Sequence, residues 1–160
     1  VVTLFHEFGH LMRDLLTTAP YAEQSGTNVV RDFVEVPSQI FENWAWEYDS
    51  LKHFARHYKD DSLLPEELHK KMMDARNVGS GIFTLQQIFY GMLDMTYHDR
   101  YDPEIEDRTT TDVVRELQNK ITPFEFLEGT HFEAGFGHLY GYAAGYYGYL
   151  WAKVYAEDMF

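Results

Sequence analysis

Apolar residues recur at every third or fourth position along most of the chain, and this period predicts helices. The alternation of apolar and polar residues that is typical of strands is absent, as are internal repeats and low-complexity tracts. We therefore predict an all-α fold. The predicted helices span about 1–17, 29–48, 51–58, 65–77, the stretch from a break at 79–81 to 97, 112–121 and 142–160.

Proline and acidic residues mark several of these helix boundaries. Pro20 ends the first helix. Pro65 starts the fourth, and Glu66 and Glu67 follow it, where acidic side chains interact favourably with the helix dipole. Residues 102–111 are predicted to form a linker that ends in the cap of the next helix.

The segment 129–148 has a different composition, because glycines there are interleaved with tyrosine, phenylalanine and histidine. Glycine at this density makes a helix costly. We expect 129–141 to be a flexible loop that leads into the closing helix at 142–160. Such loops commonly move over bound substrate in enzymes, although taken alone this one is more simply a surface loop of low order.

The chain is acidic and rich in aromatic residues. Its formal net charge of -13 at pH 7 argues against nucleic acids and anionic membranes as partners. The aromatic content of 17% suggests a cleft lined with rings, and 45% hydrophobic residues suffice for a core in one domain of 160 residues. Without cysteine, a disulfide or a thiolate metal site is impossible. No apolar run is long enough to span a bilayer.

Both ends of the chain have the pattern of a helix interior. The chain begins on Val1-Val2 without a capping residue, and it ends at Phe160 with the helical pattern still running. We therefore expect a fragment of a longer protein.

The segment His6-Glu7-Phe8-Gly9-His10 is a complete HExxH motif. Residues four apart lie on one face of a helix, so the two imidazoles can hold one zinc ion. Glu7 does not ligate in this pattern, but it can take a proton from a zinc-bound water and pass it to a leaving amine. The motif therefore predicts a zinc peptidase that hydrolyses amide bonds.

The alternative interpretation of this motif is an amphipathic surface helix that happens to carry two histidines. Apolar residues surround the motif almost continuously from Val1 to Leu16, which favours a helix buried on most sides. Polar side chains in such a setting need partners, and this requirement favours the metal site.

A catalytic zinc needs a third protein ligand. The longer HExxHxxGxxH pattern is not continued, since Arg13 and Leu16 stand where it requires glycine and histidine. A carboxylate on the next helix is the most plausible ligand. One face of that helix carries Asp32, Glu35, Gln39 and Glu42. Glu35 and Glu42 are equally good candidates on physical grounds.

Motifs along nearly the whole chain resemble those of the M3 family of zinc oligopeptidases, of the thimet oligopeptidase type. They are Phe5-His6-Glu7-Phe8-Gly9-His10, Ser25-Gly26-Thr27, Asp32-Phe33-Val34-Glu35-Val36-Pro37-Ser38-Gln39, Glu42-Asn43-Trp44, Phe136-Gly137-His138-Leu139 and Tyr146-Tyr147-Gly148-Tyr149-Leu150-Trp151, in the family's order. This resemblance implies that His6, His10 and Glu35 ligate Zn²⁺ and that Glu7 is the general base.

The resemblance also implies roles for residues of the glycine-rich segment. Tyr149 matches the tyrosine that hydrogen-bonds the oxyanion, and His138 and Tyr142 match substrate-contacting positions. Tyr142 and Tyr149 are seven residues apart, so in one helix their hydroxyls would share a face. Both would then be able to reach a carbonyl oxygen.

Together these features predict a zincin-type helical core of a metalloendopeptidase that cleaves short oligopeptides. Its predicted parts are the zinc helices 1–48, a helical middle 49–128, and a Gly/Tyr-rich substrate loop with a closing helix at 129–160. Family members are several times longer, and their two lobes enclose a channel. The alternatives are a zinc-binding fragment that is inactive without the missing lobe and a dipeptidyl carboxypeptidase of the same family. The cytoplasm is the expected compartment, with mitochondria or another organelle as the alternative.

Other polar residues receive lesser roles. Asp32 and Glu42 are hypothesised to orient the zinc-binding histidines. His53 and His57 lie four apart, but basic neighbours make a solvated helix face the better interpretation. His98, flanked by charged residues, is expected on the surface.

Overall fold

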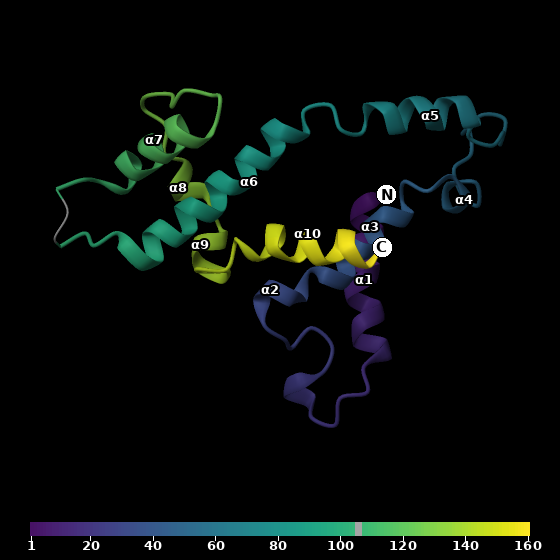
Figure 1. Ribbon diagram of the computed structural model, residues 1–160, viewed down its shortest axis with the longest axis horizontal. Coiled ribbons are helices and arrows are strands. Elements are labelled where there is room, and N and C mark those ends of the chain that lie inside the picture. Colours follow the sequence, from purple (N-terminus) through teal and green to yellow (C-terminus); the bar gives the residue numbers. More distant parts are fainter. Residues whose placement is uncertain (105–106) are drawn as a thin grey trace. The chain divides into compact units, whose positions relative to one another are not determined.

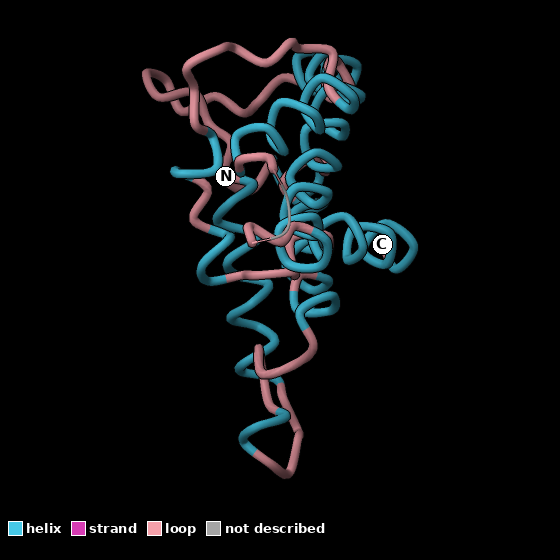
Figure 2. The backbone as a smooth tube through the Cα atoms, turned by 90° about the vertical axis from the view of Figure 1, so that its left-hand side faces the viewer, coloured by secondary structure: helices cyan, strands magenta, loops and turns pink. Residues whose placement is uncertain are grey.

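The computed structural model describes residues 1–104 and 107–160. Figures 1 and 2 show helices joined by loops, and no β-strand occurs in either stretch apart from one isolated bridge between Arg56 and Leu63. The all-α prediction is confirmed. Within the described part of the chain, no helix combines the length and the apolar character needed to cross a membrane. The chain divides into two compact units, residues 1–78 with 151–160 and residues 79–150, and each is described by itself.

The first unit contains short helices, of which α1 and α3 pack against each other. Its elements are α1 (Val2–Leu16), η1 (Ala22–Gln24), α2 (Arg31–Val34), α3 (Val36–Trp44), α4 (Tyr48–Leu51), α5 (Glu66–Ala75) and most of α10 (Gly148–Met159). The predictions for α1 and α5 are confirmed to within two residues at each end.

Gly9 allows α1 and α3 to approach closely. A Cβ atom added to Gly9 would lie 2.5 Å from Ser38 Cα and 2.8 Å from the Pro37 carbonyl oxygen. Both of these are backbone atoms, so they cannot swing aside as a flexible side chain would. Gly9 is accordingly the buried residue of α1.

The rest of α1 is more exposed than its sequence predicts. Leu4 is 71% exposed, Leu15 is 65% exposed and Leu16 is 73% exposed. The prediction of a helix buried on most sides is therefore wrong for this structure. The physical reason is that α3 covers one face of α1 and leaves these leucines outside the contact.

The predicted helix at 29–48 is broken at Glu35 into α2 and α3. Pro37 has no N–H group and cannot donate to the Phe33 carbonyl four residues earlier. Arg13 of α1 donates to that carbonyl instead, with an Nη1–O distance of 3.3 Å, and its guanidinium lies 5.2 Å from the centre of the Phe33 ring. Glu35 itself adopts φ -86° and ψ -6° at the junction.

The loop between α1 and α2 is tied back to α1 by Asp14. Its Oδ1 accepts a hydrogen bond from Thr27 N at 2.9 Å. A Cβ atom on Gly26, which has φ +55°, would lie 1.8 Å from the same oxygen. Glycine adopts this left-handed backbone without strain, and a side chain at this position would displace the Asp14 carboxylate from Thr27.

The predicted basic helix at 51–58 is absent, and α4 ends at Leu51. The chain instead forms a tight turn in which His57 N donates to Ser62 O at 2.8 Å. Asp60 Oδ1 accepts from Ser62 N at 3.1 Å, and Asp61 has φ 58°. These local side-chain to backbone bonds compete with helix formation.

The second unit packs around α6 (Ser80–Met95), which continues as a π-helical turn, η2 (Thr96–Arg100), and contacts α7 (Thr110–Ile121). Thr109 and Asp112 cap α7 reciprocally in a capping box. The core of the unit is formed by Phe89, Leu93, Val113, Val114, Leu117, Phe136 and Tyr146. The predicted linker at 102–111 includes Ile105 and Glu106, which lie outside the described residues.

The glycine-rich segment is more helical than predicted at its start and less helical at its end. The expected loop at 129–141 contains two single-turn helices, α8 (Phe132–Gly135) and α9 (His138–Gly141). The closing helix begins at Gly148, not at 142. Residues before it are held in a non-helical conformation, since Ala144 has φ 54° and its N–H, like that of Tyr146, points to the buried Asp94 carboxylate.

We predict that Gly9→Ala lowers the free energy of unfolding by about 1–3 kcal/mol, because its Cβ atom would overlap the backbone of α3. Urea unfolding followed by circular dichroism measures this change. Gly81→Ala in α6 is the matched control, because no atom lies within 4 Å of its added Cβ. A Gly9→Ala protein as stable as the Gly81→Ala control would contradict the close approach.

Candidate functional site

α1 presents His6 and His10 on the face that meets α3. Their ring centroids are 5.0 Å apart, and the side chains are 21% and 19% exposed. The spacing of four residues places them on successive turns of the helix, as the HExxH motif predicts. The two imidazoles are therefore neighbours that water can still reach.

Glu35 brings one carboxylate oxygen between the two histidines. Its Oε2 lies 3.3 Å from His6 Nε2 and 3.2 Å from His10 Nε2. The Glu35 side chain is only 9% exposed, and Ser38 Oγ donates to the same oxygen at 3.0 Å. The break between α2 and α3 places Glu35 at the start of α3, next to the α1 contact.

Glu42 contacts the other nitrogen of His6, at 2.7 Å from Oε1 to Nδ1. An ionised carboxylate can only accept, so Nδ1 carries the hydrogen. In the neutral imidazole, Nε2 then presents its lone pair to the Glu35 oxygen. His6 Nε2 and Glu35 Oε2 are then two acceptors 3.3 Å apart. Their contact is favourable only if a second proton or a cation lies between them.

The three donor atoms fit a zinc ion. They all lie within 4.8 Å of one another. Ligand atoms about 2.0–2.1 Å from a tetrahedral zinc are separated by about 3.3 Å, and the two measured separations of Glu35 Oε2 from the ring nitrogens have this length. Two imidazoles with one carboxylate also form a known catalytic zinc set that leaves a position open.

The structure distinguishes the two carboxylates, Glu35 and Glu42, that helix spacing alone left equal. Glu35 contacts the Nε2 atoms of both histidines, whereas Glu42 contacts Nδ1 of His6. Glu7 is exposed and makes no hydrogen bond or ion pair within the described part of the chain. Its carboxylate is thus open to solvent one residue from His6.

His138, Tyr142 and Tyr149 lie together in the second unit, in one group of rings. The Tyr149 hydroxyl is 3.4 Å from His138 Nε2. The rings of Tyr142 and Tyr149 stack with centroids 5.5 Å apart and an interplanar angle of 21°. The helical argument for this pair is wrong, because Tyr142 precedes the closing helix, but the two rings are adjacent nonetheless.

Tyr146 also belongs to this group of rings, and it was assigned no functional role from the sequence. Its ring centroid lies 4.9 Å from that of His138 and 5.1 Å from that of Tyr149. Burial raises the pKa of the Tyr146 phenol to about 12, and its hydroxyl donates to Gln87 Oε1 at 2.9 Å. Sequence reasoning also missed Asp94, although the single charged residue of α6, among apolar neighbours, was a signal that it needed partners.

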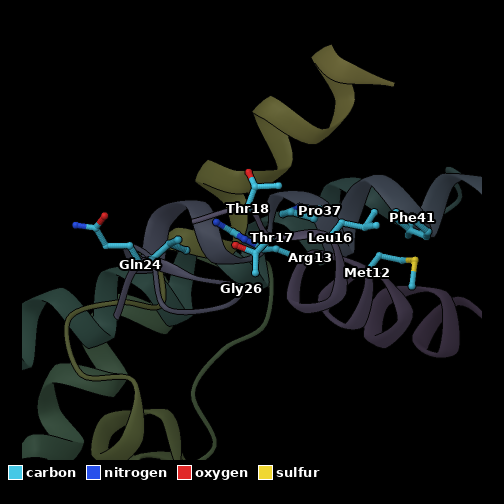
Figure 3. A pocket seen from close by; sticks show the side chains of 11 residues that line it. Met12, Arg13, Leu16, Thr17, Thr18, Gln24, Gly26, Pro37 and Phe41 are labelled. Atoms are coloured by element: carbon cyan, nitrogen blue, oxygen red, sulfur yellow. The ribbon is translucent and has the colours of Figure 1, made fainter. Parts of the chain in front are cut away.

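A groove of about 500 Å³ lies beside the C-terminal half of α1 (Figure 3). Its lining includes Met12, Leu16, Pro37 and Phe41, and Arg13 adds a charged group. None of the three candidate metal ligands lines it, so this groove and the candidate metal centre are separate features of the unit.

The chain matches one family model and several curated proteins over nearly all of its length. The family model described as "Peptidase family M3" matches residues 1–160. Mitochondrial intermediate peptidase of Arabidopsis thaliana is 41% identical over 99% of this chain and 22% of its own length. Oligopeptidase A of Escherichia coli is 39% identical over 100% of this chain and 24% of its own length. Dipeptidyl carboxypeptidase of Escherichia coli is 38% identical over 99% of this chain and 24% of its own length.

The chain thus spans about a quarter of the length of these curated relatives. The match to the family nevertheless covers every residue of the chain. This chain belongs to peptidase family M3.

Proposed function

We propose that this chain is the zinc-bearing part of a metallopeptidase that hydrolyses peptide bonds in short oligopeptides. The observation that carries the proposal is the convergence of His6 Nε2 and His10 Nε2 on Glu35 Oε2, at 3.3 and 3.2 Å. Membership of family M3 agrees with this chemistry.

His6, His10 and Glu35 would hold the zinc ion. When bound, zinc acts as a Lewis acid that polarises a carbonyl and lowers the pKa of water. Glu7 accepts the proton of the attacking water and returns it to the leaving amine as the peptide bond breaks. Its exposed carboxylate, which has no partner in the described residues, is free to do so.

Tyr149 is proposed to donate a hydrogen bond to the substrate carbonyl oxygen as negative charge develops on it. His138 and Tyr142 are proposed to contact the substrate. Two features support this assignment: the resemblance of the C-terminal motifs to the family, and the contacts of both side chains with Tyr149, by hydrogen-bond distance for His138 and by stacking for Tyr142.

The relatives differ in the reaction and the compartment that their names give. They include dipeptidyl carboxypeptidase of Escherichia coli, a probable cytosolic oligopeptidase A and a chloroplastic/mitochondrial oligopeptidase A, the last two from Arabidopsis thaliana. We propose endopeptidase action, in the cytoplasm or in an organelle. A second candidate is a zinc-binding segment without activity of its own, which the exposed leucines of α1 and the quarter-length match favour.

Cleavage of an internally quenched short peptide by the purified, zinc-loaded protein tests the proposal. Cleavage in the interior of peptides with free and with amidated C-termini supports an endopeptidase, whereas cleavage restricted to free C-termini supports a dipeptidyl carboxypeptidase. A folded protein that binds zinc but cleaves neither peptide would establish the second candidate.

We predict that Glu7→Gln retains zinc and loses turnover. The amide cannot act as a base, and general-base catalysis contributes about 10²–10⁴-fold to the rate. Metal content by atomic absorption and the initial rate of peptide cleavage are measured together. Glu23→Gln, the same change on an exposed carboxylate, is the control. A Glu7→Gln protein as active as the parent would contradict the role of Glu7 as the general base.

We predict that Glu42→Ala weakens zinc affinity by about 10–100-fold, because His6 loses the acceptor that fixes its ring and tautomer. Competition with a chromophoric chelator measures the affinity. Glu42→Gln, whose amide oxygen still accepts a hydrogen bond, should lose less. Equal zinc affinity of the parent and Glu42→Ala would show that Glu42 does not orient His6. Asp32 is hypothesised to orient the zinc-binding histidines as well, and this hypothesis fails if Asp32→Ala leaves zinc affinity unchanged.

We predict that Tyr149→Phe lowers kcat by about 100-fold, because one donor to an oxyanion is worth on the order of 3 kcal/mol. Zinc affinity should not change. Tyr140→Phe is the control, since Tyr140 lies in the same glycine-rich segment with 87% of its surface exposed. Equal kcat values for the two variants would remove Tyr149 from the mechanism.

A further inference from the structure

Asp94 is a fully buried carboxylate that the proposed chemistry does not use. It is 0% exposed and lies in α6, among the apolar residues of the second unit's core. A buried charge is costly unless hydrogen bonds compensate for it. The partners of Asp94 therefore indicate what the charge does.

The carboxylate is held by the backbone of the segment that precedes α10. Oδ1 accepts from Ala144 N at 3.0 Å, and Oδ2 accepts from Tyr146 N at 2.9 Å. Ala144 has φ 54°, a left-handed conformation that non-glycine residues seldom adopt. Backbone N–H groups flanking such a residue form a concave site for an anion, and here the anion is the side chain of Asp94.

His98 lies beside the same carboxylate and donates to the backbone carbonyl of Asp94. Its Nδ1 is 3.1 Å from Asp94 Oδ1 and 2.7 Å from the Asp94 carbonyl oxygen. Both neighbours are acceptors, so Nδ1 carries the hydrogen. The sequence predicts His98 on the surface. In the structure its side chain is 29% exposed, so only part of the ring faces solvent.

Further contacts of α6 reinforce this attachment along one face of the helix. Gln87, Gly91 and Asp94 are spaced by four and three residues, which places them on one face of α6, and His98 follows four residues later in η2. Gln87 accepts from the Tyr146 hydroxyl, and a Cβ atom on Gly91 would lie 3.7 Å from Tyr147 Cα. The backbone of α6 is thus in close contact with the 144–147 segment.

The held segment lies between two of the aromatic site residues. Gly145 N donates to Tyr142 O at 3.0 Å, and Tyr149 N donates to Tyr146 O at 3.3 Å. The Tyr146 ring packs against those of His138 and Tyr149. Fixing Ala144 and Tyr146 therefore also fixes the backbone on either side, from which Tyr142 and Tyr149 extend.

We infer that Asp94 is a positioning residue, which clamps the backbone at Ala144 and Tyr146 and so orients Tyr149, with His138 and Tyr142, for the substrate. This inference rests on the proposed function for the role of Tyr149. The clamp itself is a property of the second unit. It explains why a charge is kept inside α6 and why the closing helix starts only at Gly148.

Amide hydrogen exchange tests the clamp without any need for activity. In Asp94→Asn, at least one of the two backbone N–H groups faces an amide NH₂ group instead of an acceptor. Exchange at Ala144 and Tyr146 should become about tenfold faster or more, while exchange in α7 stays unchanged. Asp99→Asn, the same change on an exposed carboxylate nearby, is the control.

Unchanged exchange at Ala144 and Tyr146 would overturn the inference. Faster exchange that extends to α7 would overturn it as well, because Asp94 would then support the whole unit and not this segment. If Asp94→Asn does not fold, His98→Ala removes the imidazole beside Asp94 Oδ1 at a partly exposed position. It should speed exchange at the same two amides by a smaller factor, and no change there would also reject the clamp.

A double-mutant cycle with Tyr149→Phe tests the orientation of the site. Asp94→Asn alone should lower kcat by about tenfold or more with zinc content unchanged, yet add less than about threefold to the loss in Tyr149→Phe. Losses that multiply in full would show that Asp94 does not act through Tyr149. A fully active Tyr149→Phe would remove Tyr149 from the mechanism, and a parent that cleaves no peptide would contradict the proposed peptidase activity. In either case hydrogen exchange still decides whether the clamp exists.

Discussion

The close contact between α1 and α3 at Gly9 is the constraint on which the candidate metal centre depends. A helix pair separated by an ordinary side chain would hold Glu35 farther from the imidazoles of α1. With no Cβ at Gly9, the backbone of Ser38 approaches α1 directly, and Ser38 Oγ then donates to the Glu35 oxygen that faces both histidines. The helix contact and the candidate metal centre thus share the same few residues.

The break between α2 and α3 complements this contact. Pro37 interrupts the helix, Arg13 of α1 donates to the Phe33 carbonyl to which Pro37 cannot donate, and Glu35 takes the junction position. The result is a carboxylate that is 9% exposed with its oxygen between two ring nitrogens. A cation between the carboxylate and the two ring nitrogens would offset the cost of burying that charge, and this makes the cluster a candidate metal site.

The second unit holds a glycine-rich segment in one conformation, and this ordering has an entropic cost. Glycine lowers the cost of unusual backbone geometry and raises the entropy lost on ordering. The buried carboxylate of Asp94 offsets that loss with bonds to two backbone N–H groups, and the ring contacts of Tyr146 extend the order to His138 and Tyr149. In both units a single carboxylate organises groups that come from distant parts of the chain.

The sequence by itself determined the helical class, the pairing of His6 and His10 on one helix face, the capped start of α7 and the family. All of these depend on residues within about four positions of each other, or on motifs in a fixed order. Only the tertiary structure decided that Glu35 meets both Nε2 atoms while Glu42 meets Nδ1, and that Asp94 holds a segment 50 residues away. Local periodicity cannot encode these choices, because they depend on where Pro37 breaks a helix, on how closely Gly9 lets two backbones approach, and on contacts between segments far apart in the sequence.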